Sequence, residues 1–123
     1  MIKYEYAPEI KSKVLHICSK LDFKHVDMNR VACFRSFGSA SNNTIARCHA
    51  LSTIWQKTLN TKAHYIIEVL SEKYDKLSED EKEKTLIHEL MHVPKSFGGG
   101  FRHHDYVCDK NVTILHKKYK NSK

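Results

Sequence analysis

Five consecutive residues in the second half of the chain, His88 to His92, have the sequence His-Glu-Leu-Met-His. Side chains four residues apart lie on one face of an α-helix, so His88 and His92 can direct two imidazoles at one metal ion. Glu89 is rotated by about 100° from His88 around the helix, which places its carboxylate at the edge of the same site. Such a carboxylate can take a proton from water held by zinc. The pattern therefore predicts the catalytic centre of a metallopeptidase, with Glu89 as the catalytic base.

The flanking residues predict that this pattern lies late on a helix over residues 78–93. Ser78 and Glu81 have the spacing of a capping box, in which the first residue caps the helix and the fourth bonds back to it. Pro94 ends the helix just after the second histidine. Four apolar residues give the helix a side that can be buried, namely Leu86, Ile87, Leu90 and Met91.

A catalytic zinc site also needs a third protein ligand and an open position for water. Three consecutive glycines, residues 98–100, allow the chain to turn sharply after the helix. His103 and His104 follow, and either imidazole can supply the third ligand. The metzincin arrangement is excluded, because its third histidine comes six residues after the second and that position is Gly98 here.

The segment from His88 to His104 resembles the minigluzincins, small soluble zinc metallopeptidases that include proabylysin and projannalysin. The likeness rests on His-Glu-Leu-Met-His-Val-Pro-Lys, then Phe-Gly-Gly-Gly-Phe-Arg, then a histidine two residues after Arg102. That family is similar to the catalytic domains of membrane metallopeptidases of the gluzincin group. Shorter matching segments are Ala46-Arg47, Ile54 to Gln56, Tyr65 to Val69 and Asp75 to Ser78.

The resemblance implies that His104 is the third metal ligand, with His103 as the alternative because the doubled histidine leaves the register ambiguous. Cys108 lies four residues after His104, so on a helix its thiolate is a further but less favoured ligand. It implies an α+β, zincin-like domain with a backing helix, a three-stranded twisted sheet, the active-site helix below the edge strand, and a C-terminal helix. In gluzincins the strand that corresponds to residues 64–70 borders the cleft and pairs with an extended substrate; the alternative is a strand that only supports the core. Family members also suggest that the C-terminal segment holds the enzyme latent as a zymogen.

Hydrophobic periodicity predicts the remaining elements. Residues 4–6 form either a short strand or an ordered arm, and residues 38–43 form a turn or loop. We expect His104 to start the last helix, Trp55 to anchor the core or a lid, and Arg47 to pair with a buried carboxylate or line the site. His16, His25 and His64 are expected at the surface. The predicted helices are 8–21, 52–59 and 104–119, and the predicted strands are 31–37, 44–50 and 64–70.

The length of 123 residues fits one domain, with the N-terminal helix and sheet in residues 1–77, the active-site helix in 78–93, and the glycine loop and last helix in 94–123. No apolar run approaches 18 residues and no signal peptide is present, so we expect a cytoplasmic protein without a membrane partner. The four cysteines have no metal or redox spacing, so we expect isolated buried thiols.

The net charge of +7 raises a nucleic-acid partner as a hypothesis. The basic residues are scattered, however, except for a solvated C-terminal run, so we do not expect such a partner. Two alternatives to the peptidase stay open. One is a DNA-associated metalloprotease of the SprT-like kind, although the cysteine zinc ribbon usual there is missing. The other is a non-catalytic, zinc-stabilised domain that binds nucleic acid. The C-terminal basic run comprises Lys117, Lys118, Lys120 and Lys123.

We therefore predict a zinc metalloendopeptidase that acts on peptides or proteins. A further group must stabilise the oxyanion that forms during peptide hydrolysis. His103, Arg102 and Tyr106 are the candidates, and the sequence does not choose among them. The C-terminal segment is also the candidate for holding two copies of the chain together.

Overall fold

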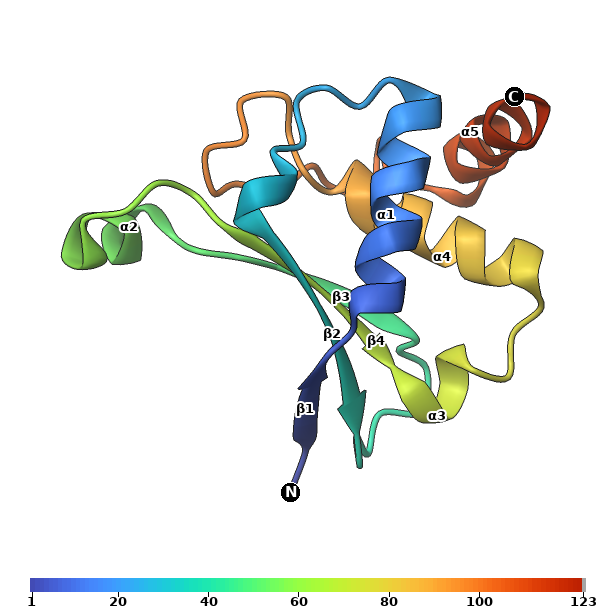
Figure 1. Cartoon of the computed structure of the whole chain (residues 1–123), viewed down its shortest axis with the longest axis horizontal. Coiled ribbons are helices and arrows are strands. Elements are labelled where there is room, and N and C mark those ends of the chain that lie inside the picture. The colour runs from blue at the N-terminus through green and yellow to red at the C-terminus, as the bar shows by residue number, and fades with distance from the viewer. Residues whose placement is uncertain (123) are drawn as a thin grey trace.

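The computed structural model describes residues 1–122, so Lys123 lies outside the described residues. A four-stranded sheet carries most of the helices on one side (Figure 1). No helix among residues 1–122 has the length and apolar character needed to cross a membrane. The elements in chain order are β1 (Lys3–Tyr6), α1 (Pro8–Leu21), a 3₁₀ turn (Met28–Arg30), β2 (Val31–Phe37), β3 (Ala46–Ala50), α2 (Thr53–Leu59), β4 (Tyr65–Leu70), α3 (Ser71–Tyr74), α4 (Glu79–Met91) and α5 (Asp109–Asn121).

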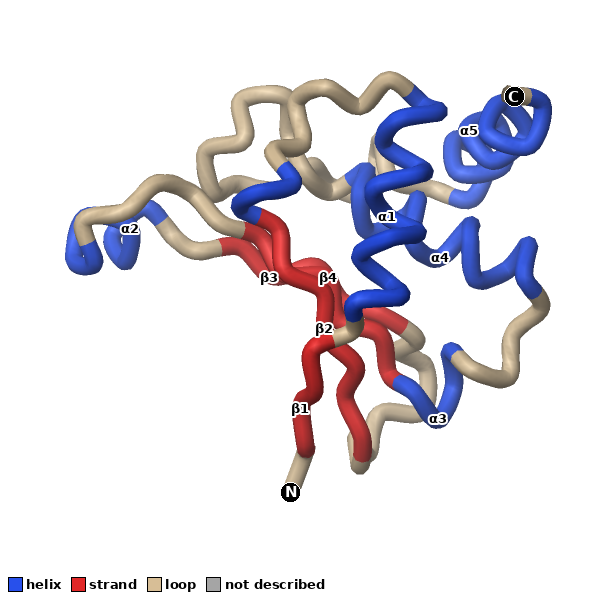
Figure 2. Tube along the Cα trace, in the orientation of Figure 1, coloured by secondary structure: helices blue, strands red, loops and turns tan. Residues whose placement is uncertain are grey.

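The strands are ordered β1-β2-β4-β3, with β2 and β4 parallel and the two outer pairings antiparallel (Figure 2). The small α+β domain expected from the sequence is confirmed, and the sheet has one strand more than the three expected. The additional strand is the N-terminal segment, which pairs with β2 from Lys3 opposite Phe37 to Tyr6 opposite Phe34. The segment is therefore a strand and not an ordered arm.

One face of the sheet packs against α1 and α4. Alternate residues of β4 point toward these helices, and Tyr65, Ile67 and Val69 are at most 1% exposed. α1 begins with Pro8 in its first turn, where the missing N–H costs no helical hydrogen bond. Its apolar residues recur at helical spacing, as predicted, and they form the backing layer of the core. Those buried residues are Ile10, Val14, Ile17, Cys18 and Leu21.

α4 begins and ends as the sequence predicts. The Ser78 side chain accepts a hydrogen bond from the Glu81 backbone N–H at 3.2 Å, and the last helical residue, Met91, precedes Pro94 by three positions. α4 packs against β3, one of the two edge strands of the sheet. The active-site helix therefore lies below an edge strand, as expected.

The prediction that the 64–70 strand offers a free edge to a substrate is wrong. β4 is hydrogen-bonded to β2 on one side and to β3 on the other, so both of its edges are occupied. One face of β4 is fully apolar, and the buried Glu68 on its other face pairs with Arg47 of β3, which fits a place in the interior of the sheet. Among the described strands, β3 is the one that presents an unpaired edge above α4.

Trp55 does not anchor the core, because α2 contains no buried residue and Trp55 is 55% exposed. α2 projects from the end of the sheet, away from the other helices (Figure 1), and its side chains Ile54 and Leu59 are likewise more than half exposed. His16 and His64 are exposed, as predicted, whereas His25 is half-buried. All four cysteines are free thiols, and burial raises the pKa of Cys18 and of Cys33 to about 12.

Two isoleucines on different helices offer a matched test of the core. Ile87 on α4 is fully buried, whereas Ile114 on α5 is 57% exposed. We expect Ile87→Ala to lower the free energy of unfolding by roughly 2–5 kcal/mol, because it removes buried methyl groups and leaves a cavity. Ile114→Ala should change it by less than about 1 kcal/mol. Urea denaturation measures both, and equal losses would contradict this assignment of the core.

Candidate active site

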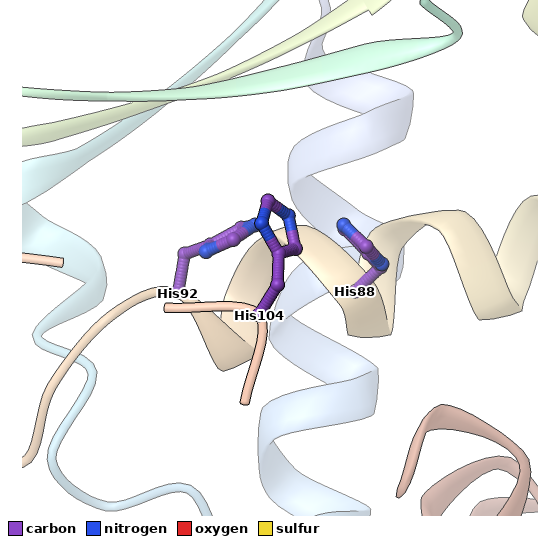
Figure 3. A group of neighbouring side chains, drawn as sticks. All are labelled: His88, His92 and His104. Carbon is purple, nitrogen blue, oxygen red and sulfur yellow. The ribbon is translucent and has the colours of Figure 1, made fainter. Parts of the chain in front are cut away.

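Two imidazoles project from the C-terminal end of α4 on the same side (Figure 3). His88 lies in the last turn of the helix and His92 is its C-terminal cap, and their ring centroids are 5.1 Å apart. The helical geometry that brings them together follows from their four-residue spacing. Pro94 stops the helix at this point, so the chain is free to turn back toward the same face.

The returning chain places a third imidazole, that of His104, against the first two (Figure 3). Its ring centroid is 5.1 Å from that of His92 and 5.9 Å from that of His88. One nitrogen from each of the three rings lies within 4.8 Å of the others, which is close enough for all three to bind one ion. His103 and Cys108 are not part of this group.

His104 does not start the last helix, contrary to the prediction. Residues 103–107 form a single turn in which the backbone N–H of Val107 donates to the carbonyl of His103, and α5 begins only at Asp109. The chain must change direction here. His104 reaches the two histidines of α4, whereas α5 packs along α4 and α1. The chain therefore bends between His104 and α5.

Two side chains from distant parts of the chain hold the glycine loop in place. The hydroxyl of Tyr65 donates to the carbonyl of Gly100 at 2.7 Å and accepts from the N–H of Gly99 at 3.0 Å. The Gln56 amide donates to the carbonyl of Gly98 at 3.1 Å. Sequence reasoning missed both roles, because the contacts span 34 to 42 residues and a tyrosine in a strand gives no signal beyond burial.

His92 is itself oriented by the loop. Its Nδ1 lies 2.7 Å from the backbone carbonyl of Arg102, and the N–H of Arg102 donates to the carbonyl of His92 at 2.7 Å. A carbonyl can only accept a hydrogen bond, so Nδ1 carries the proton and Nε2 keeps its lone pair for a metal. Such partners commonly fix the tautomer and ring orientation of metal-binding histidines.

Burial shifts the pKa values of Glu89 and His88, both on α4. Glu89 is 6% exposed, and no hydrogen bond from the described residues reaches its carboxylate, so burial raises its pKa to about 7. Burial, followed by the neighbouring His92 and His104, lowers the pKa of His88. The first shift suits a general base near neutral pH, and the second favours the neutral imidazole that binds metals.

A cleft runs past these residues beneath the free edge of β3. Its two hollows have volumes of about 460 and 260 Å³, and Glu89 and His104 line both of them. Ala46 contributes to the wall of the first hollow and Cys48 to that of the second. Burial, with a further contribution from Glu89, raises the pKa of the Cys48 thiol to about 12, so it stays uncharged.

The three candidates for oxyanion stabilisation lie in different surroundings. His103 lines the smaller hollow of the cleft, beside the imidazoles. Arg102 also reaches that hollow, but its guanidinium lies over the ring of Tyr106, 3.5 Å from the ring centroid. Tyr106 lines another cavity, on the far side of the loop, and neither hollow of the cleft.

Arg47 belongs to a separate ion pair. It lies 3.1 Å from Glu68, which is 1% exposed, so the expectation that it pairs with a buried carboxylate is confirmed. A second group of potential ligands joins α4 to α5, where His116 lies 2.9 Å from Glu83 and 4.0 Å from Asp80. The ammonium of Lys120, 3.2 Å from Asp80, already supplies a cation there, so this group connects two helices.

An α+β domain in which a His-Glu-x-x-His helix meets a third imidazole beside a buried carboxylate has the architecture of a small metallopeptidase. The family model described as "Putative phage metallopeptidase" matches residues 2–118, and the chain belongs to that family. Membership implies a metal ion, for which the three imidazoles are a suitable ligand set. No curated protein and no solved structure was found to match the chain.

The raised pKa of Glu89 predicts a pH-dependent cost to stability. The pKa of Glu89 is about 7 in the folded chain, whereas a glutamate in water has a pKa of 4.5. The stabilisation of the protonated form is complete below pH 4.5 and is lost as the pH rises through 7. We therefore expect Glu89→Gln to stabilise the metal-free protein by roughly 3 kcal/mol at pH 8 and hardly at all at pH 4.

Chemical denaturation of both chains in the presence of a chelator, at several pH values, measures this difference. The two stability curves should separate between pH 4.5 and 7. Curves that run parallel over that range would show that Glu89 ionises normally in the folded protein.

The glycine loop offers a second matched pair. Gly99 has φ +104°, and a Cβ there would lie 2.4 Å from Gln56 Nε2 and 2.7 Å from the Leu51 carbonyl, whereas a Cβ on Gly100 meets nothing within 4 Å. We expect Gly99→Ala to weaken metal binding roughly tenfold or more, because the loop must shift and take His104 with it. Gly100→Ala should stay within about threefold of the wild type. Competition with a chelator measures both affinities, and similar losses would contradict the role of this loop.

Proposed function

We propose that this protein is a zinc metalloendopeptidase, similar in its catalytic centre to the minigluzincins. The observation that carries the proposal is the convergence of His88, His92 and His104 beside the buried, unpartnered carboxylate of Glu89. Membership of a metallopeptidase family supports catalysis over a non-catalytic zinc domain. The likeness to the minigluzincins themselves, and the assignment of zinc, are parts of the proposal.

The donor set fits zinc. Three imidazoles are a ligand set found in catalytic zinc sites, and the fourth position of the tetrahedron is then left for water or substrate. Two observations favour the ligand form of these rings, namely the Nδ1 hydrogen bond of His92 and the lowered pKa of His88. When bound, zinc would supply Lewis acidity, which polarises a peptide carbonyl and acidifies water.

Glu89 then performs the proton transfers. Its carboxylate accepts a proton from the attacking water and donates it to the amine that leaves when the peptide bond breaks. A pKa raised by burial makes it a better base than a solvated carboxylate and also a competent acid. We assign the stabilisation of the oxyanion to His103, because it lines the cleft while the Arg102 guanidinium and the Tyr106 ring contact each other.

The substrate is a peptide or protein segment in extended conformation. β3 has a free edge above the cleft, and backbone pairing with such an edge binds a peptide without reading its side chains. Ala46 and Cys48 are small residues on that strand, so the cleft wall leaves room for side chains of the substrate. We therefore expect broad sequence preference.

Latency stays a prediction that follows from the resemblance. α5 packs along α4 and α1, and its Val112 lines one hollow of the cleft. Val112 and His116 are both buried, so deletion of this helix would remove part of the core together with any inhibitory contact. Association of two copies through the C-terminal segment likewise stays a prediction, as does the DNA-associated alternative.

Activity and metal binding are expected to separate at two positions. Glu89→Gln should abolish cleavage of a peptide library, by a factor of at least about 100, while one zinc ion per chain stays bound, because it removes the base and keeps the ligands. His104→Ala should lose the metal as well as the activity. Metal analysis of the purified chains and mass spectrometry of the digested library measure the two effects.

His103→Ala is the matched control for His104→Ala. It removes an adjacent imidazole, should retain the metal, and should lower the cleavage rate by roughly 10- to 1,000-fold as expected for loss of an oxyanion donor. Full activity of Glu89→Gln would refute the mechanism. Retained zinc in His104→Ala would refute the ligand assignment.

A further inference from the structure

A second cavity lies on the opposite side of the loop that carries His104. Its volume is about 340 Å³, and it is formed where the segment after α1, the end of α4, the glycine loop and α5 meet. Arg102 is the residue that it shares with the catalytic cleft. Its lining comprises Leu21, Asp22, Phe23, His25, Leu90, Met91, Val93, Lys95, Arg102, Tyr106 and Lys118.

Positive charge is concentrated around this cavity. Lys95, Arg102 and Lys118 line it, and within residues 1–122 none of the three has a carboxylate oxygen within 4.0 Å. The one carboxylate in the lining, Asp22, lies 3.6 Å from the ammonium of Lys24. Lys95 and Arg102 belong to the loop after α4 and Lys118 belongs to α5, so the three cations meet only in the folded chain.

Arg102 is held in position before any ligand arrives. Its guanidinium lies 3.5 Å from the centroid of the Tyr106 ring, and its backbone makes both hydrogen bonds to His92. A fixed guanidinium loses little freedom on binding, and its planar arrangement of N–H donors matches the oxygens of a phosphate group. Burial lowers the pKa of the nearby His25, and Lys95 and Arg102 lower it further, which reflects the positive potential in the cavity.

We propose that this cavity binds a small anion with two or more phosphate groups. Lys95, Arg102 and Lys118 have no ion-pair partner among the described residues, so an anion of comparable charge can pair with all three, whereas a monovalent anion would leave two of them unpaired. The volume is within the range of pockets for small molecules and accommodates an oligophosphate or the phosphate end of a nucleotide. The concave shape favours such a ligand over the backbone of a duplex. The inference does not depend on peptidase activity.

Isothermal titration calorimetry tests the proposal with the zinc-loaded full chain. Inorganic pyrophosphate, a nucleoside triphosphate and a short single-stranded oligonucleotide are the three probes, titrated at constant ionic strength. We expect saturable binding with one site per chain for at least one of the first two. Lys95→Ala/Lys118→Ala should weaken it on the order of 10- to 100-fold, because each substitution removes a hydrogen-bonded charge.

Lys57→Ala/Lys117→Ala is the matched control, since both lysines are exposed, neither lines the cavity, and the change in net charge is the same. It should bind within about threefold of the wild type, as expected for screened surface charges. Equal weakening of both double variants, or undiminished binding by Lys95→Ala/Lys118→Ala, would overturn the proposal. Undiminished binding by Lys95→Ala/Lys118→Ala would indicate that the anion binds to the zinc ion and not in this cavity. Binding of the oligonucleotide alone would also overturn it, in favour of an extended nucleic-acid surface.

NMR supplies a readout that is independent of affinity. His25 lines the cavity, so its ring signals should shift as the phosphate probe is added. The ring signals of the exposed His64, which does not line the cavity, should not shift. Shifts confined to the imidazoles of the cleft would place the ligand at the metal and would contradict the proposal.

Discussion

The position of the loop after α4 is the constraint on which the rest of the site depends. A helix can align two imidazoles by itself, whereas the third comes here from the turn between α4 and α5. That segment is fixed by the reciprocal hydrogen bonds between His92 and Arg102 and by the hydroxyl of Tyr65. These few bonds convert a flexible, glycine-rich connection into a surface with one definite shape. They also join the metal site to the centre of the sheet, because Tyr65 belongs to β4.

A buried carboxylate with no hydrogen-bonding partner is unfavourable for folding, and Glu89 is such a group. The surrounding core provides the compensation, since Leu86, Ile87, Leu90 and Met91 of the same helix are at most 2% exposed. The same burial gives Glu89 the pKa of a useful base. The role proposed for Glu89 is therefore opposed to the stability of this small domain, as is common at catalytic sites.

The loop separates two environments of different character. On one side lie the imidazoles and Glu89, beneath the free edge of β3. On the other side lie three cations without partners among the described carboxylates. Arg102 borders both, and its backbone carbonyl orients His92. A ligand in the basic cavity would therefore contact the residue that also positions a metal ligand, which is a short physical route between two sites.

The sequence by itself determined the parts of this protein that are local. The four-residue spacing of His88 and His92, the cap at Ser78 and the stop at Pro94 defined α4 and its chemistry, because helical periodicity and capping act within a few residues. The tertiary structure decided what depends on long-range contacts. It brought His104, and not His103, to the two imidazoles of α4, moved the start of α5 to Asp109, left Trp55 exposed, and placed β4 inside the sheet so that β3 received the free edge. Each of these outcomes depends on contacts between segments that are distant in the sequence, and the spacing of residues within one segment does not predict such contacts.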